Sequence, residues 1–264
     1  MNIRVGYIPY LNMVPFHHNF GPSPIDADGR LVEFLSMSPR ALGIEAEKGI
    51  IDAGAMSLVD SLHLSSRYEP IGAFGIGVRR EAQSVLLFSK SILTSLAGGV
   101  CAVTDETSTS FRLLQLLLEI RHGLSGIRYG RISSSALFDG EAEGLLLIGD
   151  EALKAKKEGI KGFPVVTDLG EEWFKWQGTP FVFARWMART TLRQDVKDFI
   201  ESSLRSSLKF HRANQLALAM DEVSRRRLDP QDVVHYWNEF VYELSPDHHR
   251  SIQLFSELLE KVLV

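Results

Sequence analysis

The feature that most constrains the fold is an alternation of short apolar runs with amphipathic segments over the first two-thirds of the 264-residue chain. The apolar runs are bounded by glycine, proline and polar residues, which is typical of buried strands. The segments between them place apolar side chains at the spacing of a helix face, most clearly in 108–121. This alternation predicts an α/β protein in which helices cover both faces of a parallel sheet. The predicted strands are 3–8, 30–35, 51–56, 71–78, 84–89, 99–104, 127–132, 144–148 and 181–184.

After about residue 190 the pattern becomes almost continuously helical. The predicted helical segments of this tail are 193–219, 230–244 and 245–263. A helical return of this kind often packs against the first domain of a two-lobed fold. We therefore predict one discontinuous lobe made of residues 1–89 and 180–264, and a second lobe made of residues 90–179. The chain would cross between the lobes near 88–91 and 177–181, and these crossovers would act as a hinge.

Charge and composition exclude several classes of partner. The formal net charge is −4, whereas nucleic-acid binding requires a basic surface. No apolar stretch approaches the roughly 20 residues of a membrane span, and the first residues lack the apolar segment of a secretory signal. The one cysteine, Cys101, lies in a strand-like apolar run and is expected to be buried. We expect a protein that binds neither nucleic acid nor membrane and that is cytosolic, the alternative being the mature form of a protein whose signal has been removed.

Polar side chains follow four of the predicted strands. In an open α/β sheet, ligands bind beyond the carboxyl ends of the strands. The residues concerned are Tyr10, Asn12, Ser57, Thr107, Ser108, Thr109, Ser110 and Asp150. The hydroxyl-rich turn 107–110 opens a helix, whose free N–H groups suit a carboxylate or phosphate. Each residue alone could simply cap a helix. Their common position at strand ends favours a site for a small anion.

Other chemistries have weaker support. The chain has neither a phosphate-binding loop nor a nucleophile elbow. Gly72, Gly75 and Gly77 lie inside a strand-like run and not at a strand-to-helix turn, so a dinucleotide site is not predicted. The two histidine pairs are adjacent in sequence, whereas helical metal ligands usually stand four residues apart. We therefore expect no metal and no cofactor.

The residues at the strand ends also resemble a known family. The loop Tyr10-Leu11-Asn12-Met13-Val14-Pro15 resembles the Y-L-N-x-x-P motif of the MqnA family, the chorismate dehydratases of menaquinone biosynthesis. The resemblance continues in register through segments that correspond to G-x-x-D, S-V-x-L-F-S, D-x-x-S-x-T-S, L-I-G-D-x-A-L, D-L-G-x-x-W and G-x-P-F-V-F-A-x-W. These segments are 49–54, 84–89, 105–110, 147–153, 168–173 and 178–186.

The resemblance implies a two-lobed fold of the type II periplasmic-binding-protein class, with the ligand in a cleft between the lobes. It also implies that chorismate is converted into 3-[(1-carboxyvinyl)oxy]benzoate and water without a cofactor. Asn12 and Ser84 become the predicted catalytic residues, and Asn12 would orient the substrate or polarise its leaving hydroxyl. The helix start at 108–110 is assigned to one substrate carboxylate, and Ser57 together with Ser84 to the other. Tyr10, Thr107 and Asp150 complete the predicted substrate-binding set.

Two alternatives stay open at this point. A non-catalytic binding protein for a small carboxylate could use the same fold, because fold does not fix function. The sister lyase of the pathway, MqnD, has a C-P-N-D type loop where this chain has Tyr10-Leu11-Asn12, which favours the dehydratase. Met13-Val14 and Arg185 depart from the family pattern. The proton acceptor is not identified, and a bound water or the substrate's own enolpyruvyl carboxylate could serve.

Overall fold

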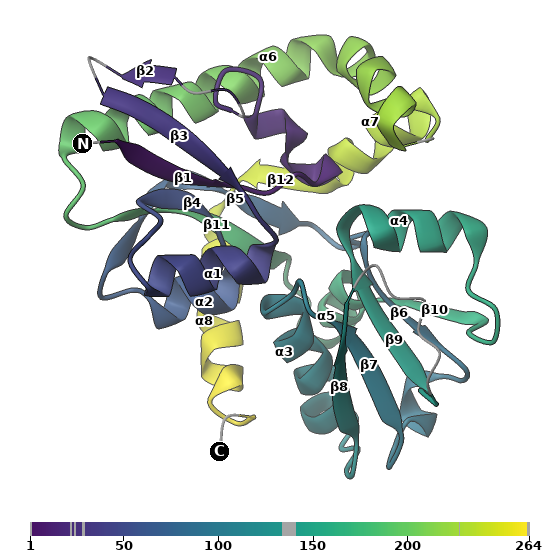
Figure 1. Cartoon of the computed structure of the whole chain (residues 1–264). Coiled ribbons are helices and arrows are strands. Elements are labelled where there is room, and N and C mark those ends of the chain that lie inside the picture. Colours follow the sequence, from purple (N-terminus) through teal and green to yellow (C-terminus); the bar gives the residue numbers. More distant parts are fainter. Residues whose placement is uncertain are drawn as a thin grey trace. The chain divides into compact units, whose positions relative to one another are not determined.

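The computed structural model describes residues 2–21, 23, 25–27, 30–133, 141–226 and 228–262. The chain forms two compact units, each made of two segments. Unit 1 comprises Met1–Gly77 and Phe183–Ser245, and unit 2 comprises Val78–Val182 and Pro246–Val264. Figure 1 shows the course of the chain through both units.

A seven-stranded sheet, in the order β12-β5-β11-β4-β1-β3-β2, forms the centre of unit 1. The strands are β1 (Ile3–Tyr7), β2 (Ile25–Ala27), β3 (Arg30–Ser36), β4 (Ala53–Ser57), β5 (Tyr68–Val78), β11 (Phe181–Arg189) and β12 (Phe240–Glu243). β1 pairs in parallel with β3 and with β4, whereas β11 runs antiparallel to β4 and β2 antiparallel to β3. The sheet is therefore mixed, and the predicted parallel arrangement holds for the three neighbouring strands β4, β1 and β3.

Helices cover both faces of this sheet (Figure 1). They are η1 (Leu11–Phe16), α1 (Pro39–Glu47), α2 (Leu58–His63), α6 (Gln194–Arg226) and α7 (Pro230–Glu239). α1 and α2 pack against β4, and α6 and α7 pack against η1. α1 begins where the sequence predicts, since Ser38 caps it by accepting the Ala41 N–H and proline opens its first turn. On the α6 face an aromatic core surrounds Phe16, whose ring lies 5.7 Å from that of Trp186.

Unit 2 is built on a five-stranded sheet in the order β10-β6-β9-β7-β8. The strands are β6 (Val85–Ser89), β7 (Val100–Thr104), β8 (Arg128–Ile132), β9 (Gly144–Ile148) and β10 (Val165–Asp168). β7 is parallel to both β8 and β9, whereas β6 is antiparallel to β9 and to β10. Cys101 is buried in β7 as expected, and burial raises the pKa of its thiol to about 11.

The helices of unit 2 complete its core. They are η2 (Leu93–Ser95), α3 (Thr109–Gln115), the π-helical turn η3 (Leu116–Arg121), α4 (Gly149–Glu158), α5 (Leu169–Gln177) and α8 (Pro246–Leu259). Trp173 of α5 packs edge-on against Phe181 and Phe255 at ring distances of 5.0 and 5.9 Å. The C-terminal helix α8 therefore belongs to the core of unit 2.

The predicted ends of the lobes differ from those of the two units. The sequence predicts the first crossover near 88–91, whereas β6 lies inside the five-stranded sheet of unit 2 and this unit begins at Val78. The second passage, between Val182 and Phe183, falls within β11 and not before it at 177–181. The chain also passes from unit 1 to unit 2 at Ser245, whereas the prediction assigned the whole tail to the first lobe.

Candidate functional site

The loop after β1 carries Tyr10 and Asn12 on a short 3-10 helix, η1. Leu11, Met13 and Phe16 of this helix are buried. The carbonyl oxygen of Leu11 accepts a 2.7 Å hydrogen bond from Nε1 of Trp237, a buried residue of α7. Apolar packing and one buried hydrogen bond therefore fix the backbone of the η1 helix that carries Asn12.

Asn12 itself is only partly buried, but its Oδ1 atom is shielded from solvent and has no hydrogen-bond partner in the described structure. A buried acceptor without a partner costs about 1–3 kcal/mol, and such atoms in native structures need an explanation. A ligand hydroxyl that donates to Oδ1 would satisfy this atom. Asn12 thus has the character expected of a group that meets a polar substrate.

Ser57 ends β4, and β4 pairs in parallel with β1. Ser57 and the loop that carries Asn12 therefore follow the carboxyl ends of neighbouring strands, as the sequence predicts. The Ser57 hydroxyl is buried and occupied. It donates to Asp60 Oδ2 at 2.7 Å and accepts the Asp60 N–H at 3.2 Å, as the N-cap of α2. Capping of α2 therefore accounts for the hydrogen bonds of the Ser57 hydroxyl.

Arg185 of β11 lies one residue from Ala184, which pairs with Ser57. Its guanidinium group is partly buried and donates from Nε and one terminal nitrogen to the Ser61 hydroxyl at 3.2 and 3.1 Å. No ion pair of Arg185 is found among the described residues, and burial lowers the pKa of its guanidinium group. A cation that is paired only with a hydroxyl is a potential partner for a carboxylate.

The turn after β7 carries the four predicted hydroxyl residues. Thr107 Oγ1 accepts the Ser110 N–H at 3.1 Å, so Thr107 caps the first turn of α3. Ser108 occupies the N-cap position but makes no side-chain capping bond. Thr109 and Ser110 are buried. Of these four residues, Ser108 is the best placed to offer its hydroxyl to a ligand.

Ser84 and Asp150 stand at the same edge of the five-stranded sheet as this turn. Val85 pairs with Ile148, and the Ser84 carbonyl accepts the Gly149 N–H at 2.8 Å, so the start of β6 lies beside the end of β9. β9 in turn is the parallel neighbour of β7. Asp150 is inside the first turn of α4, whose N-cap is Ile148, so the alternative that Asp150 caps this helix is wrong.

Acidic groups crowd this edge of unit 2. Burial and the nearby charges of Glu106 and Asp105 raise the pKa of Glu151 to about 7, although Lys154 opposes the shift. One Glu151 carboxyl oxygen is buried without a hydrogen-bond partner in the described structure. Arg131 at the end of β8 supplies the opposite charge. Its guanidinium group donates to the carbonyl oxygens of Thr104 and Thr107 at 3.0 and 2.9 Å.

Sequence reasoning gave no role to Arg131, Glu151 or Arg185. Arg131 could have been found, because it stands near the end of a predicted strand and the same rule of strand ends applies to it. Glu151 was visible as a neighbour of Asp150, but its raised pKa depends on burial. Arg185 was noted only as a departure from a pattern. Its isolation from carboxylates could not be known before its neighbours were placed.

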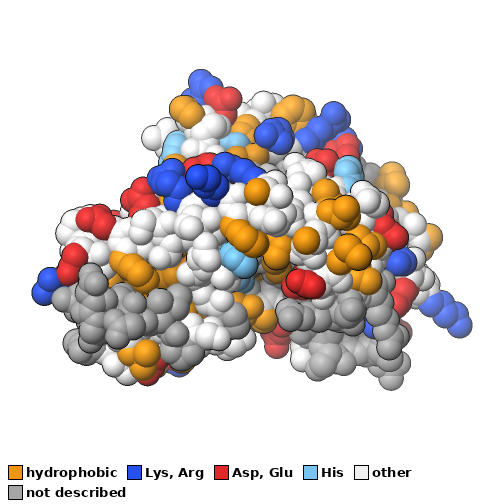
Figure 2. All heavy atoms as spheres, turned by 90° about the horizontal axis from the view of Figure 1, so that it is seen from above, with side chains coloured by type: hydrophobic (Ala, Val, Ile, Leu, Met, Phe, Trp, Pro, Cys, Tyr) orange, Lys and Arg blue, Asp and Glu red, His pale blue; other side chains and the backbone are white. Residues whose placement is uncertain are grey.

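A hollow of about 570 Å³ lies along α6, away from the predicted site residues. It is lined by Asp198, Glu201, Ser202, Arg205, Ser206 and Lys209. Arg205 forms ion pairs with Glu201 and Glu243. Figure 2, which looks onto the α6 side of Figure 1, shows basic and acidic side chains next to one another on this face. We assign this hollow no role.

Within the described ranges, no group of three or more His, Cys, Asp or Glu side chains could hold a metal ion. No helix among the described residues is both long and apolar enough to span a membrane.

Comparisons with known proteins identify the family of the chain. The profile of a family described as "Menaquinone biosynthesis" matches residues 3–261. A chorismate dehydratase from Thermus thermophilus is 28% identical over 272 residues, which cover 97% of this chain and 94% of that protein.

Solved structures share the fold at low sequence identity. Protein AF1704 from Archaeoglobus fulgidus has a TM-score of 0.79 and 20% identity, and the match covers 100% of this chain and 98% of that one. The alkanesulfonate-binding protein SsuA from Xanthomonas axonopodis pv. citri has a TM-score of 0.70 and 13% identity, over 98% and 92% of the chains. These matches confirm the predicted α/β fold of the periplasmic-binding-protein class. Since the family profile covers nearly the whole chain, this protein belongs to the menaquinone biosynthesis family.

Proposed function

We propose that this protein is a chorismate dehydratase, a carbon–oxygen lyase that converts chorismate into 3-[(1-carboxyvinyl)oxy]benzoate and water. The observation that carries the proposal is the extent of the match. The family profile spans residues 3–261, and the dehydratase from Thermus thermophilus aligns with 97% of the chain. The Asn12 amide oxygen supports the proposal, because it is buried without a hydrogen-bond partner among the described residues and could accept a hydrogen bond from a ligand hydroxyl at the predicted position.

The reaction removes a proton from the ring carbon that carries the enolpyruvyl ether and hydroxide from the neighbouring carbon. The electron pair of the broken C–H bond enters the ring, which becomes aromatic as the hydroxide leaves. A ring double bond conjugates the site of proton loss with the ring carboxylate, so negative charge accumulates on that carboxylate. Hydrogen-bond donors placed there stabilise the transition state more than the bound substrate.

Asn12 acts at the reacting carbons. Its Oδ1 accepts a hydrogen bond from the substrate hydroxyl and so fixes its direction, while the amide nitrogen can donate to the hydroxyl oxygen as that group departs. The rigid backbone of η1 keeps the amide in place. An amide is a poor base, so the proton goes to another acceptor. A bound water and the enolpyruvyl carboxylate of the substrate both fit this role.

The two substrate carboxylates need separate donors. We assign one carboxylate to the Ser108 hydroxyl and the free N–H groups at the start of α3, with Arg131 as the nearest cation of that turn. We assign the other to Ser84. Ser57, the second residue predicted for it, would have to release Asp60 before it could donate. Its main contribution is therefore to fix the start of α2.

The proposed partner is one small dianion, and the proposed place of action is the cytosol, where a soluble biosynthetic intermediate is accessible. Cell fractionation with an antibody against the protein would test the location. Recovery in the membrane or periplasmic fraction would contradict it.

Product analysis tests the function itself. Purified protein treated with EDTA should consume chorismate and form 3-[(1-carboxyvinyl)oxy]benzoate, detected by proton NMR as the appearance of four aromatic ring protons. Calorimetry on the same sample measures binding. Binding of chorismate without any product would favour a non-catalytic carboxylate-binding protein, and absence of both would contradict the assignment altogether.

A further inference from the structure

The backbone immediately before Ser84 adopts a rare conformation. Gln83 has a φ of 61°, and within the described ranges it is the one non-glycine residue with a positive φ. The Ser84 N–H bonds the Ala82 carbonyl at 2.7 Å across this residue. A three-residue turn closed in this way around a positive φ is the uncommon and strained form of the γ-turn. Strain of this kind persists only where the surroundings enforce it, and it is concentrated at functional sites.

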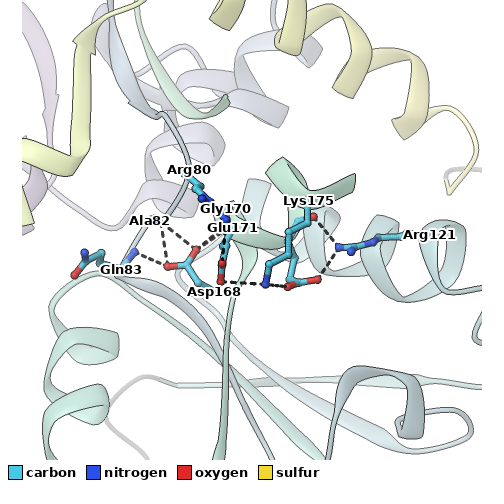
Figure 3. Close-up of polar contacts among 9 residues, drawn as sticks. Arg80, Ala82, Gln83, Arg121, Asp168, Gly170, Glu171 and Lys175 are labelled. Carbon is cyan, nitrogen blue, oxygen red and sulfur yellow. Dashed lines mark hydrogen bonds and ion pairs between the residues drawn. The ribbon is translucent and has the colours of Figure 1, made fainter. Parts of the chain in front are cut away.

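The group that enforces the turn is the carboxylate of Asp168, at the end of β10. Oδ2 accepts the Gln83 N–H at 2.6 Å, and both oxygens lie 3.0 Å from the Ala82 nitrogen. Oδ1 also accepts the N–H groups of Gly170 and Glu171 at 2.9 and 3.1 Å, as the N-cap of α5. Figure 3 shows the carboxylate between these two segments. One side chain thus joins the start of a helix to a strained turn that is distant in sequence.

The surrounding residues fit this arrangement closely. A Cβ atom added to Gly170 would lie 2.8 Å from the Arg80 carbonyl oxygen and 3.1 Å from the Ala82 nitrogen. Glycine at this position is what lets the 80–82 segment approach α5. Arg80 also lies over the Phe174 ring at 5.4 Å and 3.8 Å from Glu171. Burial raises the pKa of Asp168, and the four backbone N–H groups oppose the shift.

An ordinary N-cap does not need this second set of bonds. Asp229 caps α7 by accepting the Gln231 N–H at 2.8 Å. The additional bonds of Asp168 act on the residues that precede Ser84, whose side chain is buried and whose hydroxyl donates to the Ala82 carbonyl at 3.4 Å. Rotation of the turn would therefore move Ser84 directly. It would also disturb the bond from Gly149 to the Ser84 carbonyl.

We propose that Asp168 is a positioning residue, which holds the turn at Gln83 and thereby sets the direction of the Ser84 hydroxyl toward the substrate. The inference rests on the proposed function, in which Ser84 binds one of the two substrate carboxylates, and it assigns to Ser84 the ring carboxylate, on which charge accumulates. Asp168 does not contact substrate in this account. It acts through the backbone of residues 82–84.

The variant D168N separates the two functions of the side chain. If the amide oxygen replaces Oδ1, the cap of α5 is kept, but the amide nitrogen then faces the Gln83 N–H and cannot accept it. We expect kcat to fall ~10-fold or more, since small displacements at a reacting centre have effects of this size, with a smaller change in KM. The matched control D229N keeps its cap and should retain wild-type kcat and KM.

A rescue distinguishes positioning from general destabilisation. Glycine adopts a positive φ without steric cost, so Q83G in the D168N background should recover part of the lost kcat. A purely structural role predicts that kcat per folded molecule is unchanged in D168N and that Q83G restores nothing. Either of those results would overturn the inference.

Hydrogen exchange tests the inference without any turnover. D168N should speed amide exchange in peptides that contain residues 82–84, whereas D229N should leave these peptides unchanged. If wild-type protein does not convert chorismate but this difference is found, the proposed function fails and the support of the turn by Asp168 stands. Unchanged exchange at residues 82–84 in D168N would contradict that support directly.

Discussion

At the end of β1 in unit 1, the Asn12 amide oxygen is buried and has no hydrogen-bond partner among the described residues. At the end of β7 in unit 2, by contrast, the Thr107 hydroxyl already accepts a backbone N–H. The first edge offers an unsatisfied acceptor on a rigid loop. The second offers the N-terminus of a helix and the Ser108 hydroxyl. The carboxylates of Glu151, Glu106 and Asp105 lie near one another in the same region. The contrast indicates that the two strand-end regions serve different purposes. In the function that we propose, Asn12 of unit 1 acts on the reacting carbons, and Ser108 and Ser84 of unit 2 each bind a carboxylate.

Removal of the Asn12 side-chain amide from unit 1 tests this difference between the units most strongly. Asn12→Ala should lower kcat ~100-fold or more, the usual loss for a donor that acts mainly in the transition state. Steady-state assays of chorismate consumption measure it. Asn19→Ala is the control, because Asn19 is an exposed asparagine of the same unit that bonds Ser206. A similar decrease of kcat in both variants would indicate that substitution disturbs the fold of unit 1, and that the decrease is not specific to the Asn12 amide.

The support of the Asn12 loop gives the next largest effect. Trp237→Phe removes the donor to the Leu11 carbonyl and should lower kcat ~10-fold, because a loosened loop misplaces the amide. Trp186→Phe is matched to it, since Trp186 is equally buried and its Nε1 has no hydrogen-bond partner in the described structure. Kinetics and melting temperatures of both variants are compared. Equal kcat values would mean that the Leu11 bond does not position Asn12.

Two neighbouring hydroxyls of unit 2 should respond in opposite ways. Thr107→Ala removes the capping bond to Ser110 and should cost about 1 kcal/mol of stability. Ser108→Ala leaves capping intact and should raise KM several-fold with little change in kcat, as expected for loss of uniform binding. Urea unfolding and steady-state kinetics give both quantities. A stability loss in Ser108→Ala with unchanged KM would reverse the two roles.

The smallest expected effect is on thermal stability, and it comes from the acidic groups of unit 2. Burial and the nearby charges of Glu106 and Asp105 raise the pKa of Glu151 in the folded protein to about 7 from its ordinary value of 4.5. The folded state therefore binds the proton more tightly than the unfolded state, and stability falls as pH rises from about 4.5 to 7. After a discount for solvent screening of this partly exposed group, Glu151→Gln should raise Tm at pH 8 by roughly 2–4 °C. At pH 4 the Tm difference from wild type should be much smaller. An equal Tm difference between Glu151→Gln and wild type at pH 8 and pH 4 would contradict the raised pKa of Glu151.

Local patterns were enough to find most strands and the strand-end residues, because burial of a strand leaves an apolar run that is visible in sequence. The short strand β12 was missed. It lies inside the predicted helix 230–244, and its alternation of buried Phe240 and Tyr242 is too brief to outweigh the preceding helical pattern. Pairing with β5 decides its conformation, and such pairing is a tertiary effect.

The division into units could not be read from local pattern either. The apolar segment that forms β6 could belong to either sheet as judged by its sequence. Its pairing with β9 and β10 shows that it belongs to unit 2. For the same reason the cap formed by Asp168 is foreseeable from its sequence, but its bonds to Ala82 and Gln83 are not. The electrostatics of Arg131, Glu151 and Arg185 likewise depend on neighbours that are distant in the chain.

The division of roles between the units is tested most directly by a single-turnover experiment with enzyme in excess over chorismate and above the dissociation constant. Under these conditions weaker binding is compensated by concentration, so only the rate of the chemical step is observed. The account predicts that Ser108→Ala converts the bound chorismate at close to the wild-type rate, while Asn12→Ala binds it and leaves it almost unchanged over the same time. Conversion at the wild-type rate by Asn12→Ala, with no conversion by Ser108→Ala, would contradict the account.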